Sequence, residues 1–109
     1  MFLLERGYKI IVRNFKNILG EIDIVAQDKD VICFVEVRTR KDPFKQREAL
    51  ESVGALKQRK LSRMAVSFLK EKHWLGRKAR FDVMAISLEA AQDDVILLKN
   101  AFPVIERYA

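Results

Sequence analysis

The chain has 109 residues, and its 21 lysines and arginines outnumber its 15 aspartates and glutamates, which gives a net charge of +6. This length predicts one domain, residues 1–109, with a single modest core. The lone cysteine, Cys33, excludes an internal disulfide, and the lone histidine, His73, excludes a histidine metal cluster. The positive charge favours a polyanionic partner, although many small basic proteins bind none. No apolar run reaches transmembrane length and the first residues do not resemble a signal peptide, so we expect a cytoplasmic protein with no membrane partner.

The first part of the chain predicts a helical remnant followed by strands. Residues Phe2–Arg6 fit the last turn of a helix, with Gly7 as its stop signal. Tyr8–Phe15 alternates as a strand does, and Asn14–Leu19 turns the chain toward the next strand. The segment Gly20–Arg40 then predicts an antiparallel β-hairpin, because β-branched and aromatic residues flank the turn sequence Gln-Asp-Lys-Asp. Together these segments make a meander of three antiparallel strands.

Charged residues interrupt the apolar pattern of this hairpin. Because side chains alternate along a strand, the odd positions of the first flank share a face, and so do the even positions of the second flank. The charged members of these two faces are Glu21, Asp23, Glu36 and Arg38. A two-residue turn at Asp28-Lys29 sets the register, and Glu21 then lies opposite Glu36. Asp23 lies opposite Phe34, so three carboxylates and one arginine converge on one patch.

Such a patch is costly, since facing carboxylates repel one another and are poorly solvated among apolar side chains. A hard divalent cation would compensate, because Mg²⁺ takes oxygen ligands from one or two carboxylates, waters and substrate phosphates. The patch therefore predicts a metal-dependent phosphodiester site. In the alternative, an ordinary amphipathic hairpin, Glu21 and Asp23 form a solvated face. Glu36 then pairs with Arg38 or Arg40, and the spacing leaves both interpretations open.

The second half of the chain predicts a helix followed by two more strands. Lys41–Gly54 forms a connecting loop, and Ala55–Lys72 predicts an amphipathic helix whose apolar residues recur at i, i+3, i+4, i+7 and i+8. Arg80–Leu88 and Val95–Leu98 predict the strands. Because the helix must cross back over the sheet, the fold class is α/β with a mixed sheet. Each basic residue on the polar helix face is most simply solvated, but as a cluster near an acidic site they predict a phosphate track. These residues are Lys57, Arg59, Lys60, Arg63, Lys70 and Lys72.

Several motifs give the chain a resemblance to a known family. In chain order they are Gly-Tyr-Lys-Ile, Arg-Asn-Phe, Gly-Glu-Ile-Asp-Ile-Val-Ala, Phe-Val-Glu-Val-Arg-Thr-Arg, Glu-Ser-Val, Lys-Gln-Arg-Lys-Leu, Arg-Phe-Asp-Val and Asn-Ala-Phe. Over Arg6–Phe102 the sequence resembles the YraN-like family of bacterial proteins, which is similar to the PD-(D/E)XK nucleases and nearest to the archaeal Holliday-junction resolvases. The resemblance implies a restriction-endonuclease-like fold, with an antiparallel β-meander, a crossover helix and returning strands.

The resemblance also implies roles for individual residues. Asp23 stands at the first acidic position and Glu36 at the second, where they would hold Mg²⁺ or Mn²⁺. Arg38 stands where most members carry lysine; it would stabilise the phosphate electrostatically, but an arginine cannot act as a general base. Glu21 would be a supporting or alternative ligand. Gln58 resembles a helical glutamine that lies near the metal site in many members.

These roles predict a metal-dependent endonuclease-like protein that acts on DNA, with branched or junction DNA by analogy with the resolvases. The DNA contacts would come from Arg40, Lys57, Lys60 and Arg63. One alternative is a non-catalytic nucleic-acid-binding module on the same fold, which the presence of arginine in place of lysine favours. Another is a protein-interaction subunit whose basic helix meets an acidic partner.

The amino terminus departs from the family pattern. YraN-like proteins usually begin with a full helix that carries a glutamate facing the acidic hairpin, whereas this chain matches only the final turn of that helix. We therefore expect a truncated amino-terminal helix, apolar sheet surface left exposed, and self-association, for example as a homodimer. Weak metal affinity and low turnover would follow.

Overall fold

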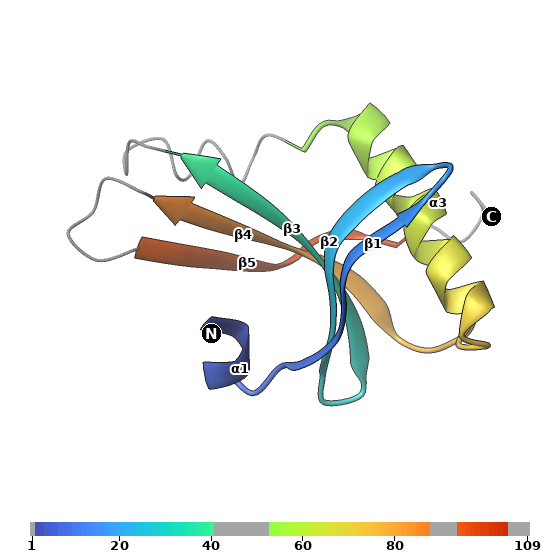
Figure 1. Cartoon of the computed structure of the whole chain (residues 1–109), viewed down its shortest axis with the longest axis horizontal. Coiled ribbons are helices and arrows are strands. Elements are labelled where there is room, and N and C mark those ends of the chain that lie inside the picture. Colours follow the sequence, from blue (N-terminus) through green and yellow to red (C-terminus); the bar gives the residue numbers. More distant parts are fainter. Residues whose placement is uncertain (1, 41–52, 88–93, 105–109) are drawn as a thin grey trace.

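One mixed β-sheet with a helix against one of its faces forms the described part of the protein, residues 2–40, 53–87 and 94–104 of a computed structural model (Figure 1). In chain order the elements are α1 (Phe2–Glu5), β1 (Lys9–Asn17), β2 (Gly20–Asp28), β3 (Val31–Arg40), α3 (Ala55–Glu71), β4 (Ala79–Ser87) and β5 (Asp94–Pro103). The sheet order is β1-β2-β3-β4-β5. Neighbouring strands are antiparallel except β3 and β4, which run parallel because the chain crosses back over the sheet through α3. The predicted α/β class is confirmed, and the arrangement is consistent with a restriction-endonuclease-like fold.

Helix α3 buries the predicted apolar stripe against β1, β2 and β3. The buried residues of this stripe are Leu61, Met64, Ala65, Phe68 and Leu69. The ring of Phe68 meets Phe15 of β1 at 5.2 Å and Phe34 of β3 at 5.9 Å between centroids, both edge to face. Aromatic pairs of this kind stabilise by about 0.5–1.5 kcal/mol beyond the burial of their area. The helix is therefore fixed over the strands that carry the acidic residues.

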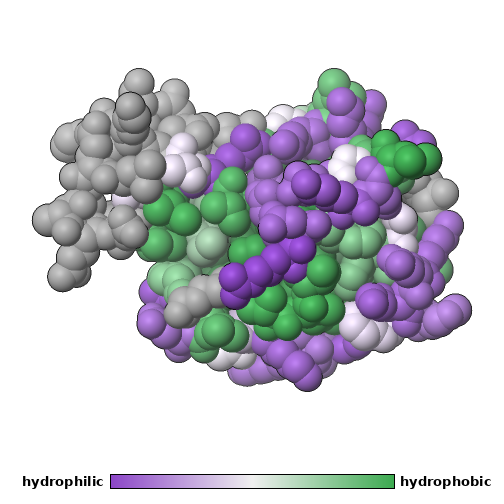
Figure 2. Space-filling view, viewed as in Figure 1, coloured by the Kyte–Doolittle hydropathy of each residue, from purple (hydrophilic) through white to green (hydrophobic). Residues whose placement is uncertain are grey.

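A second apolar cluster lies on the opposite face of the sheet. Leu3 of α1 is completely buried there, beside Ile24 of β2 and Val35 of β3. The predicted helical turn at the start of the chain is thus confirmed, and Gly7 follows it with a left-handed φ of 86°. Figure 2 shows hydrophobic surface in the region of α1 and the neighbouring strands. Apolar residues that remain partly exposed beside this cluster include Phe2, Val37, Ile86, Val95 and Leu97.

A buried polar network ties the ends of several strands together. Asp82 of β4 is completely buried, and its Oδ2 accepts a hydrogen bond of 3.0 Å from the Tyr8 hydroxyl. Its Oδ1 accepts hydrogen bonds from Arg80 Nε at 2.9 Å and from the Asn100 backbone N–H at 2.8 Å. The Arg80 guanidinium also donates to Asp28 Oδ2 at 2.9 Å. Burial, and then the charge of Asp82, raise the pKa of the Tyr8 hydroxyl, which therefore stays protonated as a donor.

Candidate functional site

The acidic residues of β2 and β3 lie where these strands stop pairing. The ladder ends at Ile24 and Val35, so Asp23 and Glu36 are the next residues on the two strands. At this point Asp23 Oδ2 accepts a hydrogen bond of 2.8 Å from the backbone N–H of Val37. A side-chain carboxylate thus takes the place of a ladder acceptor, and two carboxylates are brought to one point of the sheet.

The predicted register of this hairpin is wrong. The two-residue turn lies at Lys29-Asp30, one position later than predicted, and Lys29 has a left-handed φ of 56°. The side-chain amide of the glutamine two residues earlier donates to the Lys29 carbonyl at 2.8 Å and holds the turn there. Val25 therefore pairs with Phe34, in the place predicted for Asp23. The shift also moves Glu21 away from the buried carboxylate of β3 and puts Asp23 beside it.

Glu36 is the more buried of the two acids, with only 8% of its surface exposed. Burial, and then the charge of Asp23, raise the pKa of its carboxyl above the ordinary range. Two cations oppose this effect. Lys57 Nζ of α3 lies 3.3 Å from Glu36 Oε1, and Arg38 Nε lies 3.9 Å from the same oxygen. The site therefore brings together two acidic and two positively charged side chains from β2, β3 and α3.

The guanidinium of Arg38 carries an unsatisfied N–H. Its Nε is buried and has no hydrogen-bond partner in the part of the chain that the structure describes. The 3.9 Å separation from Glu36 is too long for a hydrogen bond. Leaving a buried donor without an acceptor costs about 1–3 kcal/mol, more for charged groups. An acceptor oxygen that reached this N–H would remove this cost.

The available donors suit a hard cation. Asp23 and Glu36 supply carboxylate oxygens, and among residues 2–40, 53–87 and 94–104 no group of three or more potential ligands is present. Mg²⁺ needs only one or two carboxylates, because waters and substrate phosphates complete its shell, and Mn²⁺ also prefers oxygen ligands. A cation bound here would also relieve the repulsion that contributes to the raised pKa of Glu36. The pair thus fits an oxygen-bound divalent ion.

The remaining predicted catalytic residues have other surroundings. Glu21 is exposed, and the side-chain amide of Gln58 donates to the Val53 carbonyl at 2.9 Å. This contact fixes the first turn of α3, and among the described residues no hydrogen bond joins Gln58 to Asp23 or Glu36. Arg40 ends β3 opposite Ser87, and its side chain lies outside the described residues.

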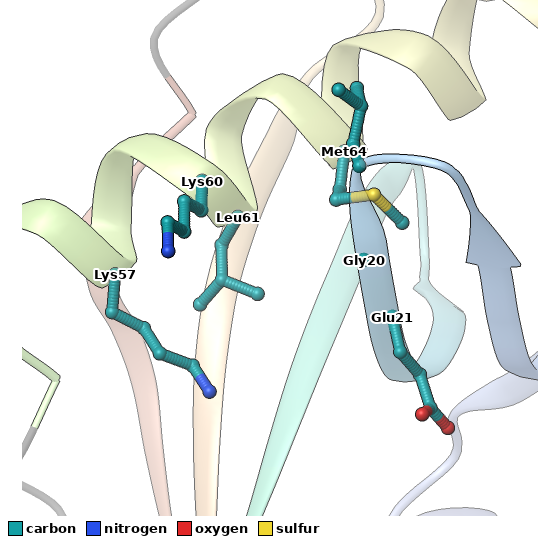
Figure 3. Close-up of a pocket in the computed structure, with 7 residues that line it drawn as sticks. Gly20, Glu21, Lys57, Lys60, Leu61 and Met64 are labelled. Atoms are coloured by element: carbon teal, nitrogen blue, oxygen red, sulfur yellow. The ribbon is translucent and has the colours of Figure 1, made fainter.

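A groove lies between α3 and the start of β2. Its volume is about 200 Å³, and Figure 3 shows residues of α3 on one wall and residues of β2 on the other. It is lined by Leu19, Gly20, Glu21, Lys57, Lys60, Leu61 and Met64. Lys57 therefore belongs both to the groove and to the acidic site. Arg63, also predicted to contact DNA, is exposed on α3 but does not line the groove.

The pairing of Lys57 with Glu36 was not predicted, because Lys57 was expected to contact only DNA. One signal was available. Lys57 lies four residues before the buried Leu61, so the helical period places it on the side of α3 that faces the sheet. A lysine at such a position has an apolar stem to bury and needs an acid within reach of its amine.

Among the described residues, no helix is long and apolar enough to cross a membrane.

Comparison with known proteins assigns the family. The family model described as "Uncharacterised protein family UPF0102" matches residues 1–86. A UPF0102 protein of Desulfosudis oleivorans is 41% identical over 101 residues, which cover 93% of this chain and 80% of the relative. UPF0102 proteins of Syntrophus aciditrophicus and Caldicellulosiruptor saccharolyticus are 40% and 39% identical, over 93% of this chain and 79% and 86% of their own lengths. The resemblance to YraN-like proteins is thereby confirmed, and the chain belongs to the uncharacterised protein family UPF0102.

Proposed function

We propose that this protein is a metal-dependent endonuclease that cleaves DNA, with branched or junction DNA as its substrate class. The observation that carries the proposal is the meeting of Asp23 and the buried Glu36 where β2 and β3 part, beside the unsatisfied Nε of Arg38. Carboxyl groups whose pKa is raised by burial and by a like charge gather at functional sites. The resemblance to the Holliday-junction resolvases supports the choice of substrate.

Each residue of the site would have a separate role in the reaction. Asp23 and Glu36 would hold Mg²⁺ or Mn²⁺, which when bound supplies an activated water and neutralises charge on the scissile phosphate. Arg38 would donate from Nε to a phosphate oxygen, and it stabilises negative charge without accepting a proton. Lys57 compensates Glu36 in the free protein. With a cation held by the two acids, the Lys57 ammonium would be left to attract the phosphate backbone.

The surroundings of the site support a polyanionic substrate. Lys57 and Lys60 both line the groove that leads away from the acids, and Arg63 is exposed on the next turn of the same helix. The whole chain carries a net charge of +6. Each phosphate that these cations neutralise releases counterions, which makes such binding strong at low salt and weak at high salt.

The substitution Asp23→Asn tests the proposal. Asparagine keeps a side-chain oxygen that can accept the hydrogen bond from Val37, so the fold is retained while the charge is lost. The matched control is Asp30→Asn, which removes the same charge from an exposed turn residue paired with Lys78. Both variants and the parent are incubated with linear, nicked and four-way DNA, with and without Mn²⁺. We expect the parent and the control to cleave only with Mn²⁺, and Asp23→Asn to bind DNA without cleaving it. Equal cleavage by Asp23→Asn would remove the carboxylate pair from the mechanism.

A second candidate function is supported by the Lys57–Glu36 salt bridge of 3.3 Å. Because a lysine already compensates part of the charge of the buried acid, the site would not require a cation, as expected of a binding module that has lost turnover. The same experiment separates the two functions. A module of this kind would bind all three DNA forms with strong salt dependence and would leave them intact with Mn²⁺.

A further inference from the structure

The turn between β1 and β2 has an unusual composition. Asn17 pairs with Gly20, and the two residues between them, Ile18 and Leu19, form the tip of the hairpin. We call these two residues the turn tip. Ile18 is completely exposed, and Leu19 is 42% exposed. Hairpin turns normally carry Gly, Asn, Asp or Ser at such positions, because these residues fit the backbone and are well solvated. Neither apolar side chain is therefore explained by the needs of the turn.

The turn tip is held in place. Asn17 Oδ1 accepts a hydrogen bond of 2.8 Å from the Leu19 backbone N–H, and Asn17 Nδ2 donates to Ser67 Oγ of α3 at 3.2 Å. One amide thus closes the turn and also fastens it to the helix. An apolar group presented on a fixed turn loses little conformational freedom when it binds, which favours a binding role.

The turn tip borders the groove next to the acidic site. Leu19 gives that groove an exposed apolar edge, Leu61 and Met64 beneath it are almost completely buried, and Lys57 and Lys60 place two ammonium groups along it. Figure 2 shows a small hydrophobic area at the place of the β1–β2 turn, with hydrophilic surface around it. An apolar point beside a cationic groove is complementary to nucleic acid, whose bases are apolar on their faces and whose backbone is anionic.

We propose that the turn tip is a wedge that enters a base step of DNA, and that the neighbouring groove receives the nucleotide that the wedge unstacks. The proposal rests on the proposed function for the identity of DNA as ligand. Isoleucine and leucine are among the residues that proteins insert between base steps to unstack and kink a duplex. Lys57 and Lys60 would hold the phosphate of the displaced nucleotide at the groove.

A wedge also accounts for a preference among DNA structures. Unstacking is costly in an intact duplex and least costly where a step is already interrupted by a nick, a mismatch or a branch. A protein with a wedge should therefore favour nicked and branched DNA over intact duplex. Because Lys57 also pairs with Glu36, the unstacked nucleotide would lie next to the acids. The position of the wedge would then determine which phosphate of the DNA lies at Asp23 and Glu36.

The test uses DNA carrying 2-aminopurine at a nick, at a branch point, or within intact duplex, with EDTA present so that cleavage plays no part. The variant Ile18→Ser/Leu19→Ser removes the wedge. The control is Leu98→Ser, which replaces a leucine of similar exposure, 40%, on β5 at the opposite edge of the sheet. We expect parent and control to raise the fluorescence at the nick and branch and to bind those forms about tenfold more tightly than duplex, because the wedge finds an open step there. The double variant should lose both effects and keep its affinity for duplex.

Two results would overturn the proposal. One is a double variant that still raises the fluorescence and still prefers branched DNA. The other is a double variant that changes the sedimentation of the free protein and leaves the fluorescence response unaltered, which would make the turn tip a contact between copies of the chain. A parent that unstacks DNA but does not cleave it with Mn²⁺ would refute the proposed function and support the wedge. A parent that binds no DNA would refute both.

Discussion

The substitution Asp82→Ala should be among the most destabilising in the protein. Asp82 is completely buried, and it accepts hydrogen bonds from the Tyr8 hydroxyl, Arg80 Nε and the Asn100 N–H. Removing one partner of a buried ion pair costs about 3–5 kcal/mol when the other charge is left uncompensated, and here Arg80 keeps Asp28 as a partner at 2.9 Å, which lessens that cost. Each further donor that loses its acceptor costs about 1–3 kcal/mol if water does not reach it. We expect a loss of about 3–5 kcal/mol, a large part of the 5–15 kcal/mol that stabilises a typical domain.

The measurement is urea unfolding followed by circular dichroism, with Asp30→Ala as the matched control. Asp30 also forms a salt bridge, to Lys78 Nζ at 3.4 Å, but the two side chains are 70% and 76% exposed. Exposed pairs contribute about 0–1 kcal/mol, so the control should unfold almost as the parent does. If Asp82→Ala is less than about 1 kcal/mol below this control at unchanged m value, the buried network does not stabilise the fold as argued.

Three further predictions concern charge and burial. Glu36→Gln should stabilise the protein at pH 7 by about 0.5–2 kcal/mol, because burial and a neighbouring carboxylate raise the pKa of Glu36 in the fold and its ionised form is destabilising. This gain should vanish as the pH falls below the ordinary glutamate pKa of 4.5, and a variant less stable than the parent at pH 7 would contradict it. Replacing Lys57, Lys60 and Arg63 together by Gln should flatten the dependence of log K for DNA on log salt by about one unit per lost phosphate contact; an unchanged slope would place the DNA path elsewhere. The Cys33 thiol is completely buried, and burial followed by the charge of Asp82 raises its pKa to about 12, so alkylation at pH 8 should proceed only through unfolding; rapid reaction of the native protein would contradict this.

The fold could be predicted because the spacing of apolar residues along the chain shows which side of a helix or strand is buried. The spacing of Leu61, Met64 and Phe68 fits only a helix with one apolar side, and these residues are buried as predicted. The crossing of the chain between β3 and β4 followed from the placing of that helix between two groups of strands. The predicted loop Lys41–Gly54 lies largely outside the described residues, and so does the predicted turn around residue 92.

The register of the central hairpin was not predictable in the same way. Its turn sequence contains two acids and a lysine, and several two-residue turns are compatible with it. The position of the turn depends on Asp28, which stays in β2 and pairs with Arg80 of β4 at 2.9 Å. That contact joins residues 52 positions apart in the sequence, so no local pattern reports it. The observed register differs from the predicted one by two positions relative to Glu36. Asp23, and not Glu21, is therefore the acid beside Glu36.

The parallel pairing of β3 with β4 has a consequence for how the protein assembles. Asp23 and Glu36 belong to one hairpin, and hairpins form within about 1–10 μs. Lys57 reaches Glu36 only when α3 has crossed the sheet, and pairings between distant segments are slow because a long loop must close first. During folding the two acids therefore meet before their lysine arrives. A divalent cation held by the two acids, as proposed above, would shield them from each other in that interval, before any substrate is bound.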